Sequence, residues 1–298
     1  MISVVIPLYN KAGTIQRAVS SAANGWPFVN EVIVVDDGST DDSLTIVKMV
    51  KHPNVTIKVV SQVNRGVANA RNKGTENAKN SLISFLDADD EHCENYASEM
   101  FKLSLVYPDA VAFTCNHVIQ KGDGVSRVPS AYLNIPERLI NLEDYYRSGC
   151  ELVNSSKVTI RRSSLIMAGG FPDGAALCED MFVWMMLFRH GQIAFSPLVL
   201  SRVYVEEDNS RHARDGQIPY PVKFFSEKEQ IQDRWERRVV WRIHYKHLLG
   251  SLLSGKKREF LTRYEAGKKL FGFRQWPFIL LLFCPTRVFE MVRVRRVL

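Results

Sequence analysis

The chain has 298 residues, of which 46% are hydrophobic and 24% are charged, and its formal net charge is +7. This length and composition suffice for a substantial buried core, which excludes a disordered or fibrous protein. The five cysteines are odd in number and irregularly spaced, which argues against a disulfide framework or a zinc site. Strand-forming residues begin almost at residue 1, so we expect no signal peptide and a cytoplasmic location.

Apolar runs that end in polar residues alternate with helical stretches along the first part of the chain. The expected strands are Ser3–Ile6, Glu31–Val35 and Val55–Val60, and the expected helices are Thr14–Ala23, Ser43–Val50 and Val67–Ala78. This alternation is typical of βαβ units and a parallel sheet, in which the loops after the strands gather at one edge. We therefore expect these polar loops to converge on one crevice.

A fourth apolar run, Leu82–Leu86, leads into three carboxylates, Asp87, Asp89 and Asp90. Carboxylates this close repel one another, and a bound cation is the simplest way to keep them ionised together. Hard oxygen ligands favour Mg²⁺ or Mn²⁺, and these cations in turn favour diphosphate groups. The alternative is a solvated acidic turn in which Asp90 caps the next helix.

Four segments resemble the family 2 glycosyltransferases, in the order and at the spacing of that family. They are Val4 to Asn10, Val34 to Asp41, Asn64 to Gly74, and Phe85 to Asp90. The resemblance covers roughly residues 2 to 205. It implies a GT-A fold, which is a Rossmann-like, mostly parallel sheet flanked by helices. It also implies a nucleotide-sugar donor, Mn²⁺ or Mg²⁺ as cofactor, and transfer with inversion.

The resemblance places Pro7, Tyr9 and Asp37 around the nucleotide base. A carboxylate at Asp37 can accept the imide N–H of uracil, and the other two side chains can form a flat wall for the base. UDP is the expected nucleotide, with dTDP or GDP as the alternatives. For Asp36 we favour a structural role in the turn. Lys11 either reaches the diphosphate or is an ordinary surface lysine.

Asn64 and Arg71 complete the expected nucleotide-sugar site. Arg71 is expected near the diphosphate or the acidic run, where a guanidinium makes strong charge-assisted bonds. The alternative is a helix arginine that pairs with a neighbouring acid. Asp89 matches the metal-binding carboxylate of the family, and Asp87 matches the one near the ribose or the metal. Asp90 is expected to orient its neighbours or to cap the helix.

The second half of the catalytic region contains a candidate base. A Gly-Gly-Phe turn precedes Glu179, Asp180 and an amphipathic helix over Met181–Arg189, and this order also resembles the family. The resemblance assigns Asp180 to deprotonate the acceptor hydroxyl during in-line attack, with Glu179 supporting it. The alternative is a helix N-terminus stabilised by two acids through its dipole.

A third metal ligand is expected from the polar segment that follows the strand Leu198–Val205. His212 is the candidate, because related enzymes sometimes bring a loop over the donor there; a solvated histidine is the alternative. His244 and His247 lie on a helical face of mixed charge, so we expect both at the surface.

The passage Asp215–Pro221 contains proline and glycine and indicates the end of the catalytic fold. We expect a GT-A domain over residues 1–220 and a helical region over 221–298, with helices at Glu227–Leu253 and Lys256–Leu270. The tail beyond Phe271 combines aromatic, aliphatic and arginine residues, and its apolar run is too short to span a bilayer. It favours a helix lying on an anionic membrane surface; a helix packed on the catalytic domain is the alternative.

The expected function is metal-dependent, inverting transfer of a hexose from a UDP-sugar to a saccharide or lipid-linked oligosaccharide. The setting would be surface polysaccharide assembly at the inner face of the plasma membrane. One alternative is a catalytically silent protein that binds nucleotide sugar or membrane lipid. The presence of both Asp89 and Asp180 argues against it, because a binder needs no acceptor base. Nucleic-acid binding is not expected, since no recognition module is evident.

Overall fold

The computed structural model describes residues 1–121, 124, 126–129, 135–205 and 216–281. The chain forms two compact units. One, here called the sheet unit, consists of Met1–Ala175 and Asp180–Glu207; the other, the helical unit, consists of Ala176–Glu179 and Asp208–Leu298. The helical unit thus begins earlier in the chain than residue 221, and it includes a short segment just before Asp180.

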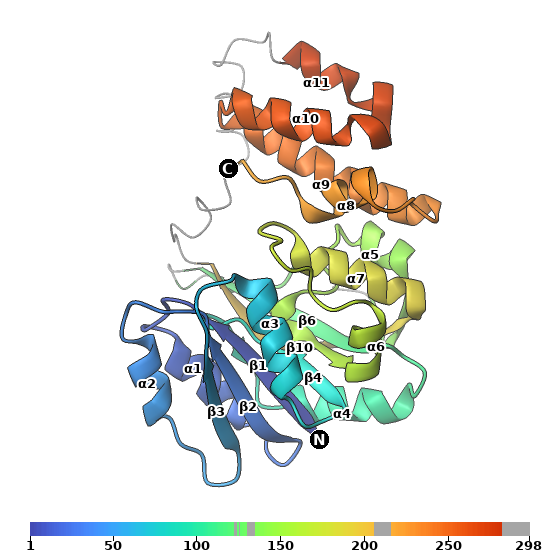
Figure 1. The fold of residues 1–298 in the computed structure, drawn as a ribbon. Helices are drawn as coiled ribbons and strands as arrows, with labels where there is room; N and C mark the ends of the chain where they lie inside the picture. The colour runs from blue at the N-terminus through green and yellow to red at the C-terminus, as the bar shows by residue number, and fades with distance from the viewer. Residues whose placement is uncertain (122–123, 125, 130–134, 206–215, 282–298) are drawn as a thin grey trace. The chain divides into compact units, whose positions relative to one another are not determined.

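The sheet unit is a mixed α/β structure with one central, mostly parallel sheet flanked by helices, as predicted (Figure 1). In sheet order the main strands are β3 (Thr56–Ser61), β2 (Val29–Asp36), β1 (Ile2–Leu8), β4 (Leu82–Phe85), β9 (Val158–Arg161), β6 (Ala112–Lys121), β10 (Ile193–Val205) and β5 (Glu91–His92). β3, β2, β1 and β4 are parallel neighbours, so their carboxyl ends lie at one edge of the sheet. β9 runs antiparallel between β4 and β6, which brings the carboxyl ends of β6 and β10 to the same edge.

The helices of the sheet unit follow the strands as the sequence predicts. They are α1 (Ile15–Ala23), α2 (Ser43–Met49), α3 (Val67–Asn77), α4 (Tyr96–Val106), α5 (Leu142–Arg147), α6 (Arg162–Met167) and α7 (Glu179–His190). Two short strands, β7 (Ser126–Arg127) and β8 (Arg138–Ile140), extend the sheet. The three helices predicted in the first part of the chain are confirmed to within one residue at each end.

β1 is buried along its whole length because helices cover both faces of the sheet. Its even-numbered residues face the core that α1 and α4 complete. Val5 points to the opposite face, where Gly74 of α3 approaches so closely that an added Cβ would collide with the Val5 side chain. The missing side chain at Gly74 therefore allows α3 to lie directly on β1, with its first turns at the carboxyl edge of the sheet.

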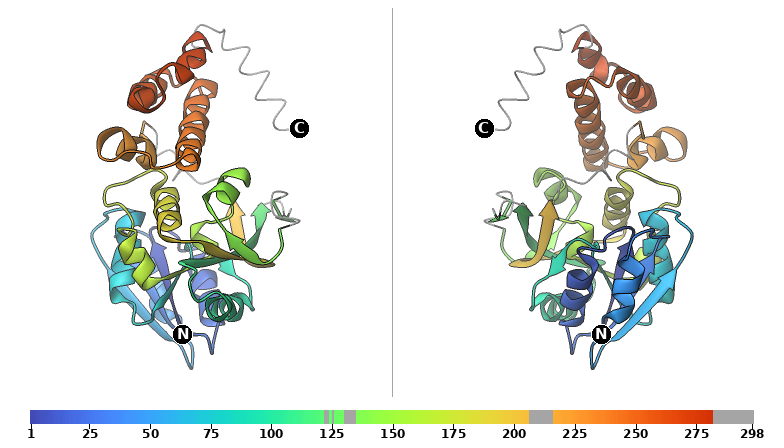
Figure 2. Two further views of the ribbon diagram at one scale, coloured as in Figure 1. Left: turned by 90° about the vertical axis from the view of Figure 1, so that its right-hand side faces the viewer. Right: turned by 90° about the vertical axis from the view of Figure 1, so that its left-hand side faces the viewer.

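The helical unit consists of α8 (Tyr220–Glu227), α9 (Arg234–Leu253), α10 (Lys257–Phe271) and α11 (Trp276–Leu281), and α10 packs on α8 and α9 (Figure 2). The single helix predicted over Glu227–Leu253 is wrong. The chain leaves the helical conformation after Glu227, and the Asp233 side chain accepts from the backbone N–H groups of Trp235 and Glu236 to start α9 anew. No helix in the described part of the chain is long and apolar enough to cross a membrane.

The predicted surface position of His244 is also wrong. Its side chain is buried in the helical unit, and its Nε2 lies 2.7 Å from Oε1 of Gln275. Gly267 on α10 makes room for the imidazole ring, because a Cβ at that position would overlap it. His247 is half-buried, and its Nε2 lies 3.4 Å from Sγ of Cys178.

Candidate active site

The loops after β1 and β2 are tied together at the carboxyl edge of the sheet. The backbone N–H of Asn10 donates to Ser39 Oγ at 3.1 Å, and Asn10 Oδ1 accepts from the Thr40 backbone N–H at 2.7 Å. The next residue, Lys11, donates its backbone N–H to Ser43 Oγ at 2.8 Å. Asn10 adopts a positive φ of 50°, a conformation that asparagine tolerates better than most residues. These bonds hold the loop that carries Tyr9 and Lys11 in one shape.

Asp37 joins the loop after β2 to the loop after β3. Its side chain is buried; Oδ1 accepts from Gln62 Nε2 and the Arg65 backbone N–H, and Oδ2 accepts from the Gly66 backbone N–H, all at 2.8 Å. A carboxylate offers about four acceptor positions, so these three hydrogen bonds leave one position on Oδ2 that they do not use. Asp36 instead accepts from the Ser39 backbone N–H at 3.0 Å, as expected for a residue that shapes the turn.

The other predicted base-binding residues lie around Asp37 with very different exposure. Pro7 is buried inside β1, whereas the Tyr9 side chain is 47% exposed just beyond the strand. Asn64 is exposed in the loop after β3. Gly38, at a φ of 77°, lies so close that an added Cβ would be 3.1 Å from the Asn64 backbone nitrogen. The two loops are thus in contact at this point.

Two cations neutralise the acidic run after β4. Nη2 of Arg71 lies 2.9 Å from Oδ1 of Asp87, and Nζ of Lys11 lies 2.8 Å from Oδ2 of Asp89. The Arg71 side chain is 4% exposed and stacks over the ring of Phe171, whereas the Asp87 carboxylate is 36% exposed. Both acids therefore combine a protein cation with access to solvent. Neither alternative given for Lys11, a diphosphate contact or an ordinary surface lysine, includes this ion pair with the acidic run.

Asp90 is neither a solvated acid nor a helix cap. The carboxyl group is buried, Oδ1 accepts from the Tyr204 backbone N–H at 2.9 Å, and Oδ2 is hydrogen-bonded to Ser156 Oγ. The same Ser156 Oγ accepts from the Asp87 backbone N–H at 3.2 Å. Burial, together with the charges of Asp87 and Asp89, raises the pKa of Asp90 well above its usual range. Asp90 thus shares Ser156 with the Asp87 backbone and does not cap the next helix, whose N-cap is Asn95; its orienting role stays a prediction.

The Gly-Gly-Phe turn connects α3 to α7, the helix that carries the candidate base. The side-chain amide of Asn72 donates to the Phe171 carbonyl at 2.7 Å and accepts from the Phe171 backbone N–H at 2.9 Å. Gly170 adopts a φ of 69°, and an added Cβ would lie 3.0 Å from Asn72 Oδ1. The Phe171 ring makes edge contacts with Phe85 of β4 and Trp184 of α7. One aromatic side chain thus links the strand before the acidic run to α7.

Glu179 and Asp180 lie in the first turn of α7, which begins two residues before the predicted start at Met181. Glu179 is buried, whereas Asp180 is half-buried and its Oδ1 accepts from the Met181 backbone N–H at 2.7 Å. The segment before them belongs to the helical unit, in which the Tyr220 backbone N–H donates to the Leu177 carbonyl at 2.9 Å. The partly exposed carboxylate of Asp180 is thus the more accessible acid of the pair.

A family model for glycosyl transferase family 2 matches residues 3–164, which is more than half of the chain. The chain belongs to this family. It is 28% identical over 213 residues to a poly-beta-1,6-N-acetyl-D-glucosamine synthase of Staphylococcus aureus (strain MSSA476), covering 69% of this chain and 50% of the relative. It is 39% identical over 90 residues to a chondroitin synthase of Pasteurella multocida (strain Pm70), covering 30% of this chain and 9% of the relative. This glycosyltransferase therefore spans half or less of the length of these relatives.

A solved structure agrees with the fold of this glycosyltransferase over most of its length. The crystal structure of residues 1–349 of TarS from S. aureus, in complex with UDP-GlcNAc, superimposes with a TM-score of 0.71 at 18% sequence identity. The match covers 90% of this chain and 81% of that one. At this identity the match is evidence of fold, and it confirms the predicted GT-A fold.

The described side chains of the glycosyltransferase supply only part of the ligand shell that a divalent cation needs. Among the residues that the structure describes, no group of three or more His, Cys, Asp or Glu side chains is arranged to hold a metal ion. Mg²⁺ usually binds through one or two carboxylates, with substrate phosphates and water completing the shell. The partly exposed oxygens of Asp87 and Asp89 fit that pattern. His212, the predicted third ligand, lies outside the described residues.

Two other polar residues of this site are not among the site residues that the sequence analysis predicts. Ser156 bridges the acidic run from a distant part of the chain, and Gln62 supports Asp37. No local signal marks Ser156, because its partners lie 66 and 69 residues away. Gln62 could have been found, since it follows the third predicted strand at the same sheet edge as the other site residues.

Proposed function

We propose that this glycosyltransferase moves a hexose, with inversion, from a UDP-sugar to a hydroxyl group of a saccharide or lipid-linked oligosaccharide in polysaccharide synthesis. The observation that carries the proposal is the pairing of Asp87 and Asp89 with separate cations at the sheet edge that also carries Asp37. Such an arrangement suits a nucleoside diphosphate, which offers both a base and two phosphates. The relatives' names, a polysaccharide synthase and a UDP-GlcNAc complex, support the same substrate class.

The nucleotide base would bind beside Asp37. The remaining acceptor position on Asp37 Oδ2 suits the imide N–H of uracil, and the exposed ring of Tyr9 offers a stacking surface. Since Asp37 is already held by three hydrogen bonds, it would lose little side-chain freedom on binding the base. This preorganisation favours UDP over a nucleotide that lacks the imide donor.

The diphosphate would bind beside Lys11 and Arg71, whose charges lie next to the acidic run. Asp89, with Asp87 beside it, would hold Mn²⁺ or Mg²⁺ together with the phosphate oxygens. A bound metal would supply Lewis-acid neutralisation of the charge on the leaving diphosphate. With the leaving group stabilised in this way, no second carboxylic acid is needed to protonate it.

Asp180 would accept the proton of the acceptor hydroxyl as that oxygen attacks the anomeric carbon. A single displacement in which the base stands opposite the leaving group inverts the configuration. Glu179, buried beside Asp180, would support the first turn of α7 and not contact the acceptor. The half-buried position of Asp180 leaves its carboxylate accessible to an acceptor hydroxyl.

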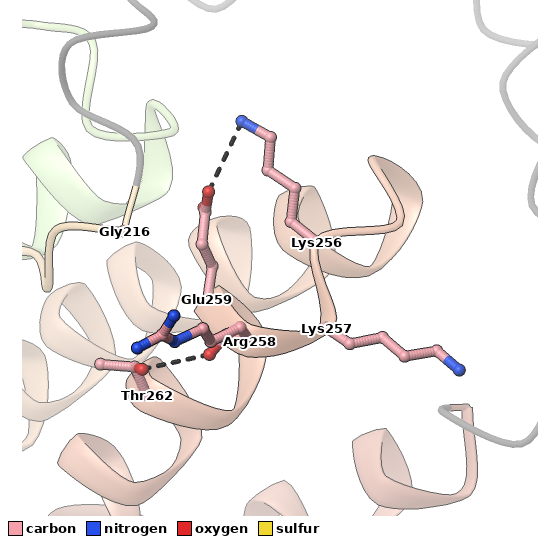
Figure 3. Close-up of a pocket in the computed structure, with 6 residues that line it drawn as sticks. All are labelled: Gly216, Lys256, Lys257, Arg258, Glu259 and Thr262. Carbon is pink, nitrogen blue, oxygen red and sulfur yellow. Dashed lines mark hydrogen bonds and ion pairs between the residues drawn. The ribbon is translucent and has the colours of Figure 1, made fainter.

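The charge distribution supports attachment to an anionic membrane surface from the cytoplasmic side. The segment 208–298 holds twenty of the thirty-nine lysines and arginines but nine of the thirty-two acidic residues, so the remainder of the chain has a negative balance. At the start of α10, Lys256 pairs with Glu259 at 3.5 Å, whereas Lys257 extends away from the helix (Figure 3). A basic helical unit suits anionic lipid head groups. The predicted membrane-binding tail begins near Phe271; its first part includes α11, and its remainder, residues 282–298, lies outside the described residues.

The test of membrane attachment is co-sedimentation of the full-length protein with vesicles. We expect binding to vesicles containing phosphatidylglycerol at 20 mM salt, release at about 500 mM salt because the attraction is screened, and no binding to phosphatidylcholine vesicles. Protein that stays in the supernatant with the anionic vesicles at low salt would contradict membrane attachment and leave the transferase proposal intact.

The decisive test of the transferase proposal is a screen of nucleotide sugars for Mn²⁺-dependent turnover. We expect one UDP-sugar to be consumed by the wild type and not by Asp89→Ala. Asp109→Ala is the matched control, because Asp109 is an exposed acid in the loop before β6, at the opposite edge of the sheet. Turnover of no donor would contradict the proposal and favour a catalytically silent binder. Turnover unaffected by both metal removal and Asp89→Ala would contradict the proposed metal-dependent mechanism.

A further inference from the structure

The main-chain carbonyl of Asp89 is bound by Arg17 of α1. Nη2 of Arg17 donates to the Asp89 carbonyl at 2.5 Å. The guanidinium lies over the ring of Tyr204, with Cζ 3.7 Å from the ring centroid. A guanidinium in this position makes a cation–π contact and a charge-assisted hydrogen bond at the same time.

Tyr204, next to the last residue of β10, is in turn attached to the residues after Asp89. Its backbone N–H donates to Asp90 Oδ1 at 2.9 Å, and its hydroxyl donates to Glu91 Oε2 at 3.0 Å. Arg202 adds an ion pair to Glu91 at 3.2 Å. Three successive residues, Asp89, Asp90 and Glu91, are therefore held by α1 and β10 through Arg17 and Tyr204.

From this geometry we propose that Arg17 and Tyr204 are positioning residues that set the metal affinity of Asp89 without contacting the metal. The inference rests on the proposed function, in which Asp89 holds a divalent cation together with the diphosphate. The described residues include no cage of three or more acidic, His or Cys ligands, so affinity depends on how accurately a few carboxylate oxygens are placed. Residues that orient metal ligands typically change metal affinity by about 10- to 100-fold when they are altered.

The chemistry of the contact requires arginine specifically. The planar guanidinium can stack on the Tyr204 ring and still direct Nη2 to the Asp89 carbonyl, whereas an ammonium group is a compact point charge without a stacking face. Lysine at residue 17 would therefore preserve the charge near the acidic run but not the geometry. This difference separates a positioning role from simple charge compensation.

The test measures Mn²⁺ binding in the presence of UDP by electron paramagnetic resonance, alongside the Mn²⁺ dependence of turnover. We expect Arg17→Met and Arg17→Lys to weaken Mn²⁺ binding about tenfold, with maximal turnover recovered at high Mn²⁺. Tyr204→Leu removes the ring and should have the same effect. Tyr204→Phe keeps the ring and the backbone N–H, and should bind Mn²⁺ within about twofold of the wild type.

Arg147→Met is the control, because Arg147 belongs to an exposed ion pair with Glu143 on α5. A purely structural role would lower the melting temperature or the active fraction but leave the Mn²⁺ affinity of the folded protein unchanged, and that result would overturn the inference. If the wild-type protein bound no Mn²⁺ in the presence of UDP, both the metal in the proposed function and this inference would be contradicted. If the wild type bound Mn²⁺ and the Arg17 variants bound it with the same affinity, only this inference would be overturned.

Discussion

The ammonium of Lys11 lies 2.8 Å from a carboxylate oxygen of Asp89, and the two side chains are 22% and 28% exposed. The pair joins the loop after β1 to the acidic run after β4. Because both groups are accessible, a diphosphate with its cation could separate them and take up both charges. The ion pair therefore marks the position at which the proposed donor phosphates and metal would enter.

Replacing Lys11 by methionine should weaken donor binding more than catalysis. Hydrogen bonds to charged groups contribute about 1.5–3 kcal/mol, and 1.4 kcal/mol corresponds to a tenfold change in affinity. We expect the KM for the UDP-sugar to rise about tenfold or more, measured by initial rates at saturating acceptor. Lys48→Met, on the exposed face of α2, is the control. An unchanged KM would show that Lys11 is an ordinary surface lysine.

Replacing Asp180 by asparagine should abolish transfer and leave donor binding intact. A general base contributes about 10²–10⁴-fold to a rate, so kcat should fall within that range, while UDP affinity measured by calorimetry stays within about twofold. The asparagine has nearly the same shape but cannot accept a proton. Near-normal turnover of this variant would mean that another group is the base. Asp109→Asn provides the matched control for an exposed aspartate.

The ion pair between Arg71 and Asp87 should contribute to stability, because the guanidinium is 4% exposed. Breaking a fully buried pair costs about 3–5 kcal/mol. The Asp87 carboxylate is 36% exposed, so we expect Asp87→Asn to lower the free energy of unfolding by less, about 1–3 kcal/mol, in urea titrations. Asp173→Asn breaks an exposed pair with Arg65 and should cost less than about 1 kcal/mol. Equal effects of the two variants would contradict this account.

Lys157 should make stability depend on pH above neutrality. Its side chain is fully buried, Nζ donates to the Glu151 carbonyl at 2.9 Å and lies 3.2 Å from His117 Nδ1, and burial lowers the pKa of Lys157 from 10.5 to about 7. Between these two pKa values the unfolded chain binds more protons than the folded chain, so stability rises with pH across that window. We expect Lys157→Met to flatten this rise in urea titrations from pH 7 to 10.

The control for Lys157 is Lys58→Met, which removes an exposed lysine hydrogen-bonded to Asn77 at 2.8 Å. In urea titrations, Lys58→Met should show the same slope of unfolding free energy against pH as the wild type. If wild type and Lys157→Met showed the same slope, the folded-state pKa of Lys157 would have to be close to its unfolded value. The buried lysine would then be protonated throughout the range.

Much of the fold could be predicted from local patterns. The centres of β1 and β2 are apolar runs, Val4–Ile6 and Val32–Val35, and α1 between them has a periodic apolar face, so their order follows from the sequence alone. The prediction of one helix over Glu227–Leu253 was wrong because residues 228–232 include helix-forming Lys, Glu and Gln and no proline or glycine, so the local sequence does not mark the break. The side chain of Asp233 caps a new helix after it. The predicted surface position of His244 was wrong because Gly267 and Gln275, which cover its side chain, come later in the chain.

The sequence by itself determined that acidic residues stand at strand ends on one edge of a parallel sheet, because strand alternation and its polar endings are local. Only the tertiary structure decided which partners these acids have. The sequence allowed Asp90 to be a solvated helix cap, but in the structure it is buried and hydrogen-bonded to Ser156 and to the Tyr204 backbone. Asp89 forms an ion pair with Lys11. Such pairings depend on the packing of distant segments, and no local pattern records which side chains that packing brings within hydrogen-bonding distance.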